Sequence, residues 1–398
     1  MSSPSASAQG RPDARGETGA LWASRALTPR RALERVRLVH RQGRIVSLRA
    51  EVEAEPADDV WTDSILAPGL VDLQVNGGAG AAFDDPEPEE RRRAARFHLE
   101  RGTTSLLATL VSAPLESLLE AAARIELCPP VVGLHLEGPF LSPEKAGAHS
   151  LAALVPPTRA RVDALVECAG GVLRMLTLAP ELPGALDAIA RLREAGVVVA
   201  AGHSRATLER VRAGIERGLG FVTHLGNASD WPSRSLDPEL GFRTSEPGLV
   251  GSFLVDRRLR GSVIADGVHL HPELIRALVE LRGPASLALV SDATPAAGLP
   301  PGRYRLGARE VRLHPQGFAT AGEGLAGSTQ LLIDGVRVAT RQAGLPLATA
   351  LEMATSTPAA VLGLSDRKGT LEPGSDADLL VLGADLEVRA TYLAGARV

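Results

Sequence analysis

Polar side chains follow several of the short apolar runs in this chain, at the point where each run ends. The residues at these ends are Gln74, Asn76, Glu137, His203, His224 and Asp292. Apolar runs of this length are typical of buried parallel strands, and in a parallel barrel the carboxyl ends of all strands open onto one rim. We therefore expect these six side chains to converge.

Three of them form a candidate ligand set for a metal ion. Glu137, His203 and His224 offer one carboxylate oxygen and two imidazole nitrogens, which suits a divalent cation such as Zn²⁺ with a fourth position open to water. A bound metal lowers the pKa of its water to around 7, and Asp292, which is not needed as a ligand, could take the proton. The set predicts hydrolysis of an amide, a urea or an imine.

Gln74 and Asn76 are spaced by two residues, so they point to the same face of a strand. They stand where a pair of imidazoles would hold a second ion. Amide side chains are poor ligands for Zn²⁺. The sequence therefore predicts one metal ion, with this pair as the remnant of a second site.

The elements that must position these residues alternate along the chain. The apolar runs at 69–75, 104–110, 131–137, 172–178, 196–202, 221–225, 261–266 and 286–292 read as strands, and most are followed by a stretch with helical spacing. Eight such units predict a (β/α)8 TIM-like barrel over residues 67–365. A doubly wound open sheet is the rival, but no G-x-G-x-x-G follows the first strand.

Both ends of the chain differ from the middle. Residues 21–66 and 366–398 carry short β-like runs, and we expect them to form one small β-sandwich domain, with 1–20 as a disordered extension. We expect a strand hairpin over 302–320, a long loop over 226–248 and helices over 330–342 and 346–362.

The composition excludes several classes of protein. The 398 residues are 44% hydrophobic and 23% charged, with a formal net charge of −4, which argues against a disordered chain and against a nucleic-acid partner. No apolar run approaches about 18 residues, so no membrane span is expected. Cys128 and Cys168 are too few for a disulfide framework, and we expect a cytoplasmic protein.

Longer motifs then resemble one family. They are APGLVDLQVNGG, GLHLEGPFLSPEKAGAHS, VVVAAGHSRAT, FVTHLGNA, SEPGLVG, IADGVHL, VSDATPAAG, LAGSTQLLIDGVR and KGTLEPGSDADLLVL. In this order they resemble the N-acetylglucosamine-6-phosphate deacetylases of the amidohydrolase superfamily, from about residue 25 to the end. GLHLEGP and AGHS together are specific, whereas PGLVD and GSDADLLVL mark only the wider superfamily.

The resemblance implies a role for each matching residue. Glu137, His203 and His224 would bind one divalent ion, with zinc as the first candidate and iron, manganese and cobalt open, and Asp292 would deprotonate the water and protonate the departing amine. Contacts to the sugar or its phosphate fall on His149, Asn227, Ala228 and His269. The resemblance also implies a small-molecule substrate, an N-acetylated amino-sugar phosphate, and a homodimer.

One departure affects the expected phosphate contact. The family typically reads R-E-P-G where this chain has Ser245 followed by Glu-Pro-Gly, and that arginine holds the 6-phosphate. Arg243 or Arg234 could replace it, or the substrate could be another N-acyl sugar. A cyclic amide substrate and a barrel that binds a sugar phosphate without turnover stay open as alternatives.

Overall fold

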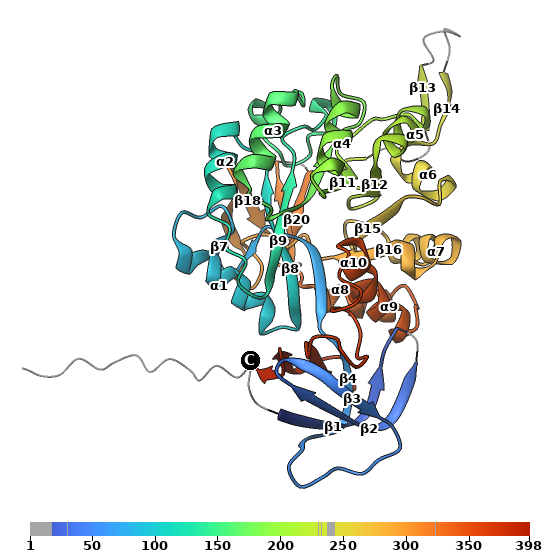
Figure 1. Ribbon diagram of the computed structural model, residues 1–398. Helices are drawn as coiled ribbons and strands as arrows, with labels where there is room; N and C mark the ends of the chain where they lie inside the picture. The colour runs from blue at the N-terminus through green and yellow to red at the C-terminus, as the bar shows by residue number, and fades with distance from the viewer. Residues whose placement is uncertain (1–17, 30, 230, 232, 237–242, 323) are drawn as a thin grey trace, which may run out of the picture.

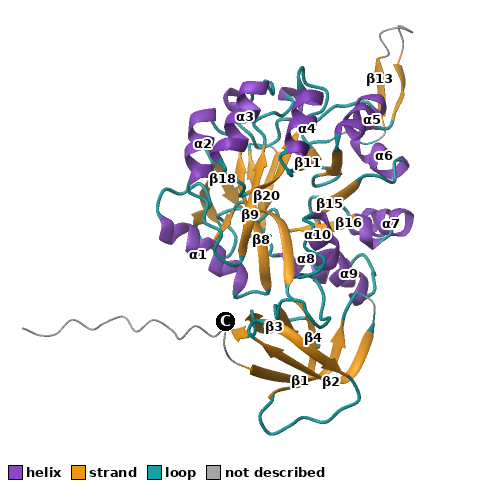
Figure 2. Ribbon diagram, viewed as in Figure 1, coloured by secondary structure: helices purple, strands orange, loops and turns teal. Residues whose placement is uncertain are grey.

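The computed structural model describes residues 18–398 except 30, 230, 232, 237–242 and 323. It has a strand barrel surrounded by helices and, below it in Figure 1, a separate sheet that carries both the first strands and the last strands of the chain. Figure 2 shows the helices on the outside of the barrel strands. Residues 1–17, most of the predicted extension, lie outside the described residues, and β1 already begins at Thr18.

The barrel sheet has eight strands, and each hydrogen-bonded neighbour pair in it is parallel. The strands are β5 (Leu70–Val75), β8 (Thr103–Val111), β9 (Val131–Glu137), β10 (Leu173–Leu178), β11 (Val198–Ala201), β12 (Leu219–Val222), β15 (Arg260–Ile264) and β16 (Leu287–Val290). Each overlaps one of the apolar runs expected to be strands, although β12 ends at Val222, before His224. The predicted (β/α)8 barrel is confirmed.

The first and last barrel strands meet through bonds that join β5 and Asn76 to the residues following β16. The backbone nitrogen of Asp292 donates to Gln74 O at 3.0 Å, and that of Asn76 donates to Ala293 O at 2.8 Å. The buried carboxylate of Asp72 accepts from the backbone nitrogen of Ser291 at 3.2 Å. These bonds close the barrel and bring the ends of β5 and β16 together.

The barrel is filled, so a ligand can enter only at its rim. Leu73, Leu107, Met175 and Phe221 are among the buried side chains that pack inside it, as in other barrels of this type. A second apolar cluster lies between the strands and the surrounding helices.

Most of the helices follow amphipathic patterns, whereas α6 is buried over most of its length. They are α1 (Pro88–Leu99), α2 (Leu115–Ala123), α3 (Arg159–Cys168), α4 (Ala185–Glu194), α5 (Leu208–Arg217), α6 (Gly248–Val255), α7 (Pro272–Arg282), α8 (Leu332–Arg341), α9 (Leu347–Ala354) and α10 (Ser356–Val361). In α5 the Thr207 side chain caps the first turn, Val211 and Ile215 are buried on one face, and Gly218 ends the helix with φ +116°. The predicted helix 346–362 is interrupted at Thr355, whose φ and ψ are not helical.

Short elements shape the rim of the barrel. They are β6 (Gly77–Gly78), β7 (Ala81–Ala82), β13 (Ser233–Leu236), β14 (Arg243–Glu246), β17 (Gly302–Leu306), β18 (Arg309–Leu313), β19 (Phe318–Ala321), β20 (Gly324–Ser328) and 3-10 turns at Pro143–Lys145 and Leu151–Ala153. A third 3-10 turn, Pro284–Ser286, lies at the opposite end of the barrel, directly before β16. The predicted hairpin 302–320 is part of a four-stranded antiparallel sheet, β17 to β20, and the predicted loop 226–248 contains the β13–β14 pair.

The small sheet joins both ends of the chain. Its strands are β1 (Thr18–Leu27), β2 (Ala32–Arg41), β3 (Arg44–Arg49), β4 (Asp59–Pro68), β21 (Leu379–Leu382), β22 (Val388–Leu393) and β23 (Ala396–Arg397). They form one seven-stranded sheet in the order β23-β22-β21-β4-β1-β2-β3. The boundaries at residues 66 and 366 stay a prediction. Among the described residues, no helix is both long and apolar enough to cross a bilayer.

Candidate active site

A cavity of about 400 Å³ lies at the carboxyl ends of the barrel strands. The lining residues that the sequence had singled out are Asn76, Glu137, His149, His203, His224, Asn227, Ala228, His269 and Asp292. Leu306 and Leu325, from the β17–β20 sheet, also line it. Gln74 lies beneath the cavity, 1% exposed and bonded to two of the lining residues.

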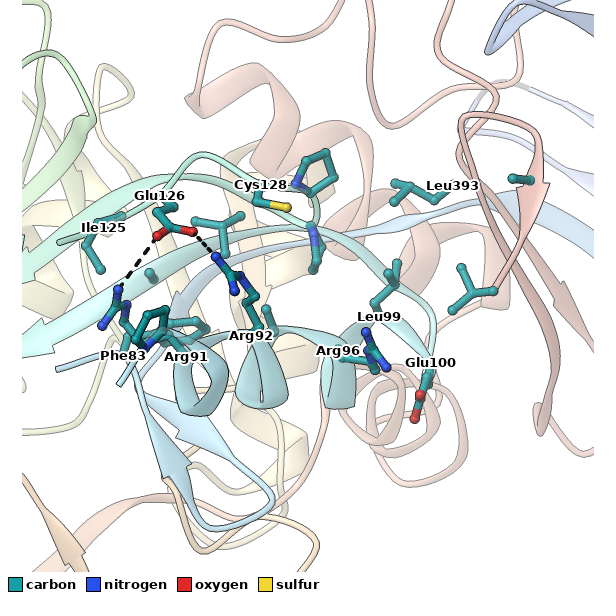
Figure 3. A pocket seen from close by; sticks show the side chains of 18 of the residues that line it. Phe83, Arg91, Arg92, Arg96, Leu99, Glu100, Ile125, Glu126, Cys128 and Leu393 are labelled. Carbon is teal, nitrogen blue, oxygen red and sulfur yellow. Dashed lines mark hydrogen bonds and ion pairs between the residues drawn. The ribbon is translucent and has the colours of Figure 1, made fainter. Parts of the chain in front are cut away.

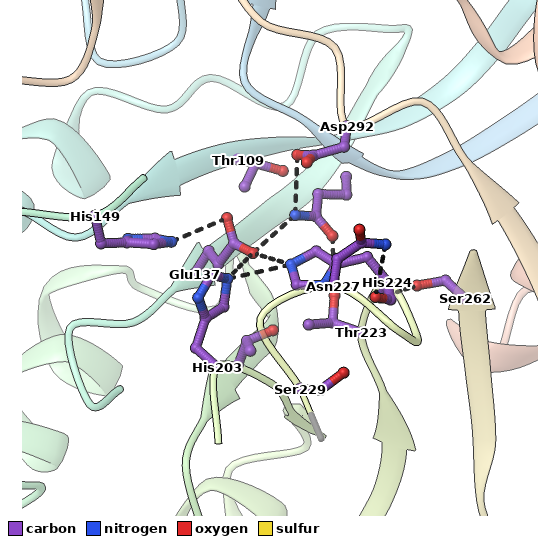
Figure 4. Close-up of polar contacts among 12 residues, drawn as sticks. Thr109, Glu137, His149, His203, Thr223, His224, Asn227, Ser229, Ser262 and Asp292 are labelled. Carbon is purple, nitrogen blue, oxygen red and sulfur yellow. Dashed lines mark hydrogen bonds and ion pairs between the residues drawn. The ribbon is translucent and has the colours of Figure 1, made fainter. Parts of the chain in front are cut away.

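At the centre of this cavity, two imidazoles face one carboxylate (Figure 4). Glu137 Oε1 is 2.7 Å from His224 Nε2 and 3.2 Å from His203 Nε2, and the two nitrogens are 3.2 Å apart. Ligand atoms about 2 Å from a shared cation would be separated by roughly 3 Å. The arrangement therefore fits a metal ion bound by these three atoms after a small outward shift.

The hydrogen bonds of the imidazoles decide which of them can be ligands. His203 Nδ1 is 2.9 Å from the carbonyl oxygen of Lys145, so it carries the proton and leaves the Nε2 lone pair free for a metal. His149 Nδ1 accepts from the backbone nitrogen of Ser112 at 3.2 Å, so its proton is on Nε2. Although Glu137, His149 and His203 also come within 4.8 Å of one another, a neutral His149 offers this cluster a donor and no lone pair.

The backbone turns sharply where the strands end. His203, His224, Ala228 and Asp292 have φ values of +48°, +25°, +44° and +48°. Non-glycine residues in this region cost about 1–3 kcal/mol each and persist where the surrounding structure holds them, as at functional sites. Here the turns direct three polar side chains back into the cavity.

Two carboxylates of the site have pKa values displaced in opposite directions. Burial, and then repulsion from Glu137, raises the pKa of Asp292 to about 6. Burial also acts to raise the pKa of Glu137, but interactions with the surrounding imidazoles, first His149 and then His203 and His224, hold it well below its usual range. One carboxylate is thus stabilised as an anion, while the other is poised to exchange a proton near neutral pH.

The pKa values of the two imidazoles are also displaced in opposite directions. Burial lowers the pKa of His203 to about 4, so this ring is neutral at pH 7, as a metal ligand must be. Burial opposes the charge on His224 too, but Glu137 outweighs it and the pKa of His224 is raised.

On the other wall of the cavity, His269 is held by an acid. Its Nδ1 is 2.6 Å from Asp266 Oδ2, and Asp266 Oδ1 accepts from the backbone nitrogens of Val268 and His269. The ring therefore presents Nε2 as its free nitrogen. The other histidine of this segment, His271, caps α7 by accepting from the backbone nitrogen of Glu273.

The segment with the expected phosphate contacts is only partly described. Asn227 and Ala228 line the cavity, and Asn227 Nδ2 donates to His224 O at 3.3 Å. Ser245 is exposed on β14, whereas the side chains of Arg243 and Arg234 lie outside the described part of the structure.

Sequence reasoning missed three supporting residues. They are Thr223, whose hydroxyl bonds Gln74; Asp266, which bonds His269; and His98, whose Nε2 lies 2.9 Å from Gly77 O beside Asn76. Asp266 could have been found three residues before His269 in IADGVHL. Thr223 and His98 lie far in the sequence from the residues that they bond, so no spacing in the sequence indicates them.

A second cavity, of about 430 Å³, lies between α1 and the start of β9 (Figure 3). Arg91 and Arg92 on its wall form ion pairs with Glu126. Among the described residues, the group around Glu137 is the one that brings three ligating side chains together. We therefore assign the chemistry to the smaller cavity.

Comparison with known proteins agrees with this geometry. Residues 65–398 match the amidohydrolase family. An N-acetylglucosamine-6-phosphate deacetylase of Danio rerio is 39% identical over 353 residues, which cover 84% of this chain and 85% of the relative. This chain belongs to the N-acetylglucosamine-6-phosphate deacetylase family of amidohydrolases.

Other members of this deacetylase family show its range. An N-acetylgalactosamine-6-phosphate deacetylase of Escherichia coli O157:H7 is 35% identical over 354 residues, covering 87% of this chain and 91% of the relative. A Mycobacterium smegmatis N-acetylglucosamine-6-phosphate deacetylase mutant, solved with N-acetyl-D-glucosamine-6-phosphate, has a TM-score of 0.89 at 35% identity, with 96% of this chain and 99% of that chain covered.

Proposed function

We propose that this protein removes the acetyl group from N-acetylglucosamine 6-phosphate, giving glucosamine 6-phosphate and acetate. The observation that carries the proposal is the convergence of Glu137, His203 and His224 beside the buried acid Asp292. Its relatives at 35–39% identity act on phosphorylated N-acetylhexosamines. The alternatives of a cyclic amide substrate or of binding without turnover are not favoured.

Glu137 Oε1, His203 Nε2 and His224 Nε2 would hold one divalent ion, and we propose zinc. The donor set fits, because His203 has its lone pair directed at the cluster and Glu137 is held as an anion. Such an ion supplies positive charge that polarises a carbonyl group and acidifies water. Gln74 and Asn76 use their amides to bond Asp292, which supports a single-ion site.

Asp292 is the residue that moves protons in this proposal. Its carboxylate accepts a proton from the attacking water as the new C–O bond forms, and returns that proton to the amine nitrogen as the amide C–N bond breaks. A pKa of about 6 suits both roles near pH 7. His149 Nε2, which lies 3.6 Å from Glu137 Oε2, carries the hydrogen that we propose is donated to a substrate oxygen, and His269 Nε2 is free to accept one.

For the anionic end of the substrate, we propose contacts from Asn227 and Ala228, with Arg243 supplying the positive charge absent at Ser245. Support comes from the segment itself, because β14 carries Arg243 two residues before Ser245. We also propose a homodimer in the cytoplasm, which gel filtration with light scattering and cell fractionation would test.

The experiment that tests the function is a deacetylation panel on protein loaded with zinc. It compares N-acetylglucosamine and N-acetylgalactosamine, each with and without a 6-phosphate, and measures acetate released. We expect the phosphorylated glucosamine substrate to have the highest kcat/KM. A preference for the galactosamine epimer would favour the activity named for the E. coli relative. Equal kcat/KM with and without the 6-phosphate would contradict the proposed substrate.

A further inference from the structure

The side chain of Gln74 lies between the two carboxylates of the site. Its Nε2 is 3.0 Å from Glu137 Oε1 and 3.0 Å from Asp292 Oδ1. An amide nitrogen carries two hydrogens, so both are committed to these acceptors. Because Gln74 is 1% exposed, bulk water does not compete for these bonds.

Thr223 fixes the orientation of that amide. Its Oγ1 is 2.9 Å from Gln74 Oε1, and an amide oxygen can only accept, so the hydroxyl donates. Thr223 is itself 1% exposed. Gly202 makes room for it, because a Cβ at that position would lie 2.3 Å from Thr223 Cγ2. The position directly after the neighbouring strand β11 must therefore lack a side chain for the threonine to fit.

We propose that Thr223 is a positioning residue, which acts through Gln74 to hold Glu137 and Asp292 in their working orientations. The expected effect on turnover rests on the proposed function, whereas the expected effect on metal binding does not. Without the hydroxyl, Gln74 Oε1 becomes a buried acceptor with no donor, and only the two hydrogen bonds from Nε2 still hold the amide. An amide held at one end can tilt, and a tilt lengthens its hydrogen bonds to both carboxylates.

The consequence differs for the two acids. Asp292 Oδ1 receives hydrogen bonds from Gln74 and from Asn76 Nδ2 at 2.8 Å, which leaves Oδ2 for proton transfer. Glu137 Oε1, which also receives a Gln74 hydrogen, is the oxygen that faces His203 and His224. Loss of the Thr223 hydroxyl should therefore weaken metal binding and slow turnover, while the contacts to the sugar stay in place.

The test compares Thr223→Val, which keeps the shape, with Thr223→Ser, which keeps the hydroxyl. Thr177→Val is the matched control, since Thr177 is equally buried, lies on β10 two strands away, and its hydroxyl contacts His135 and not an amide. The dissociation constant for Zn²⁺ is measured by competition with a chromophoric chelator, and kcat and KM are measured for N-acetylglucosamine 6-phosphate. If the valine variant does not fold, Thr223→Ala replaces it.

We expect Thr223→Val to weaken Zn²⁺ binding and to lower kcat, each by about five- to tenfold, with KM within twofold of wild type. Thr223→Ser restores both, and Thr177→Val behaves like wild type. Wild-type zinc affinity in Thr223→Val, equal losses in Thr177→Val, or failure of the serine variant to restore affinity would overturn the proposal. Should the wild-type protein prove inactive on every sugar, the zinc measurements still decide the role of Thr223.

Discussion

Replacing Asp292 by asparagine should abolish turnover and, at the same time, stabilise the metal-free protein. Asparagine has the same shape, and its Oδ1 can still accept from Gln74 and Asn76, which now bond Asp292 Oδ1 at 3.0 and 2.8 Å. The variant loses the base that accepts the proton of water. General acid–base groups contribute about 10²- to 10⁴-fold, so we expect kcat to fall by that factor.

The stabilising effect follows from the pKa of Asp292. Its rise from 3.8 to about 6 on folding, caused first by burial and then by Glu137, means that the folded protein binds the proton more tightly than the unfolded chain does. The contribution of this carboxyl to stability is therefore greatest below about pH 4 and is lost as the pH rises through 6. At about 1.4 kcal/mol per pKa unit, the ionised group costs on the order of 3 kcal/mol at pH 8.

Two measurements on the same protein preparation check this reasoning. Acetate release is followed on zinc-loaded protein, and urea unfolding is followed on chelator-treated protein at pH 5 and pH 8. We expect Asp292→Asn to be nearly inactive, and to be more stable than wild type by a larger margin at pH 8 than at pH 5. Activity within tenfold of wild type would refute the role of Asp292 as the base, and an equal margin at both pH values would refute its raised pKa.

Three further outcomes are expected. His203→Ala should bind less than one-tenth of the wild-type zinc, as measured by metal analysis after dialysis, because it removes one of three ligands; full occupancy would contradict this. Arg243→Ala should raise KM for the phosphorylated sugar by about ten- to a hundredfold, the effect of losing a charge-assisted contact, and an unchanged KM would exclude Arg243. Burial raises the pKa of Asp72 to about 7, so Asp72→Asn should stabilise the protein more at pH 8 than at pH 5 in urea unfolding.

The barrel could be predicted because its evidence is local. Eight apolar runs of strand length alternate with helical spacing, and each polar residue at the end of a run, such as Glu137, lies on the rim because strands of a barrel end there. The strands β19 and β20 were not predicted, since their residues are mostly glycine, alanine and serine without a clear period of two.

The support of the site could not be predicted, because it depends on contacts between distant parts of the chain. Thr223 and Gln74 are 149 residues apart and meet only when the barrel closes. The tautomer of His149 depends on the backbone nitrogen of Ser112, which carries no signal in the side-chain pattern. The positive φ of Asp292 is likewise imposed by the surrounding structure, because an aspartate in the sequence does not by itself predict a left-handed backbone conformation.

The central claim is that one cation is held by Glu137, His203 and His224 while His149 donates a hydrogen bond beside it. A crystal structure of zinc-loaded protein, with anomalous data collected at the zinc edge, tests this directly. The account predicts a single zinc peak about 2.0–2.2 Å from Glu137 Oε1, His203 Nε2 and His224 Nε2. Two zinc peaks, or a single peak with His149 Nε2 among its ligands, would contradict it.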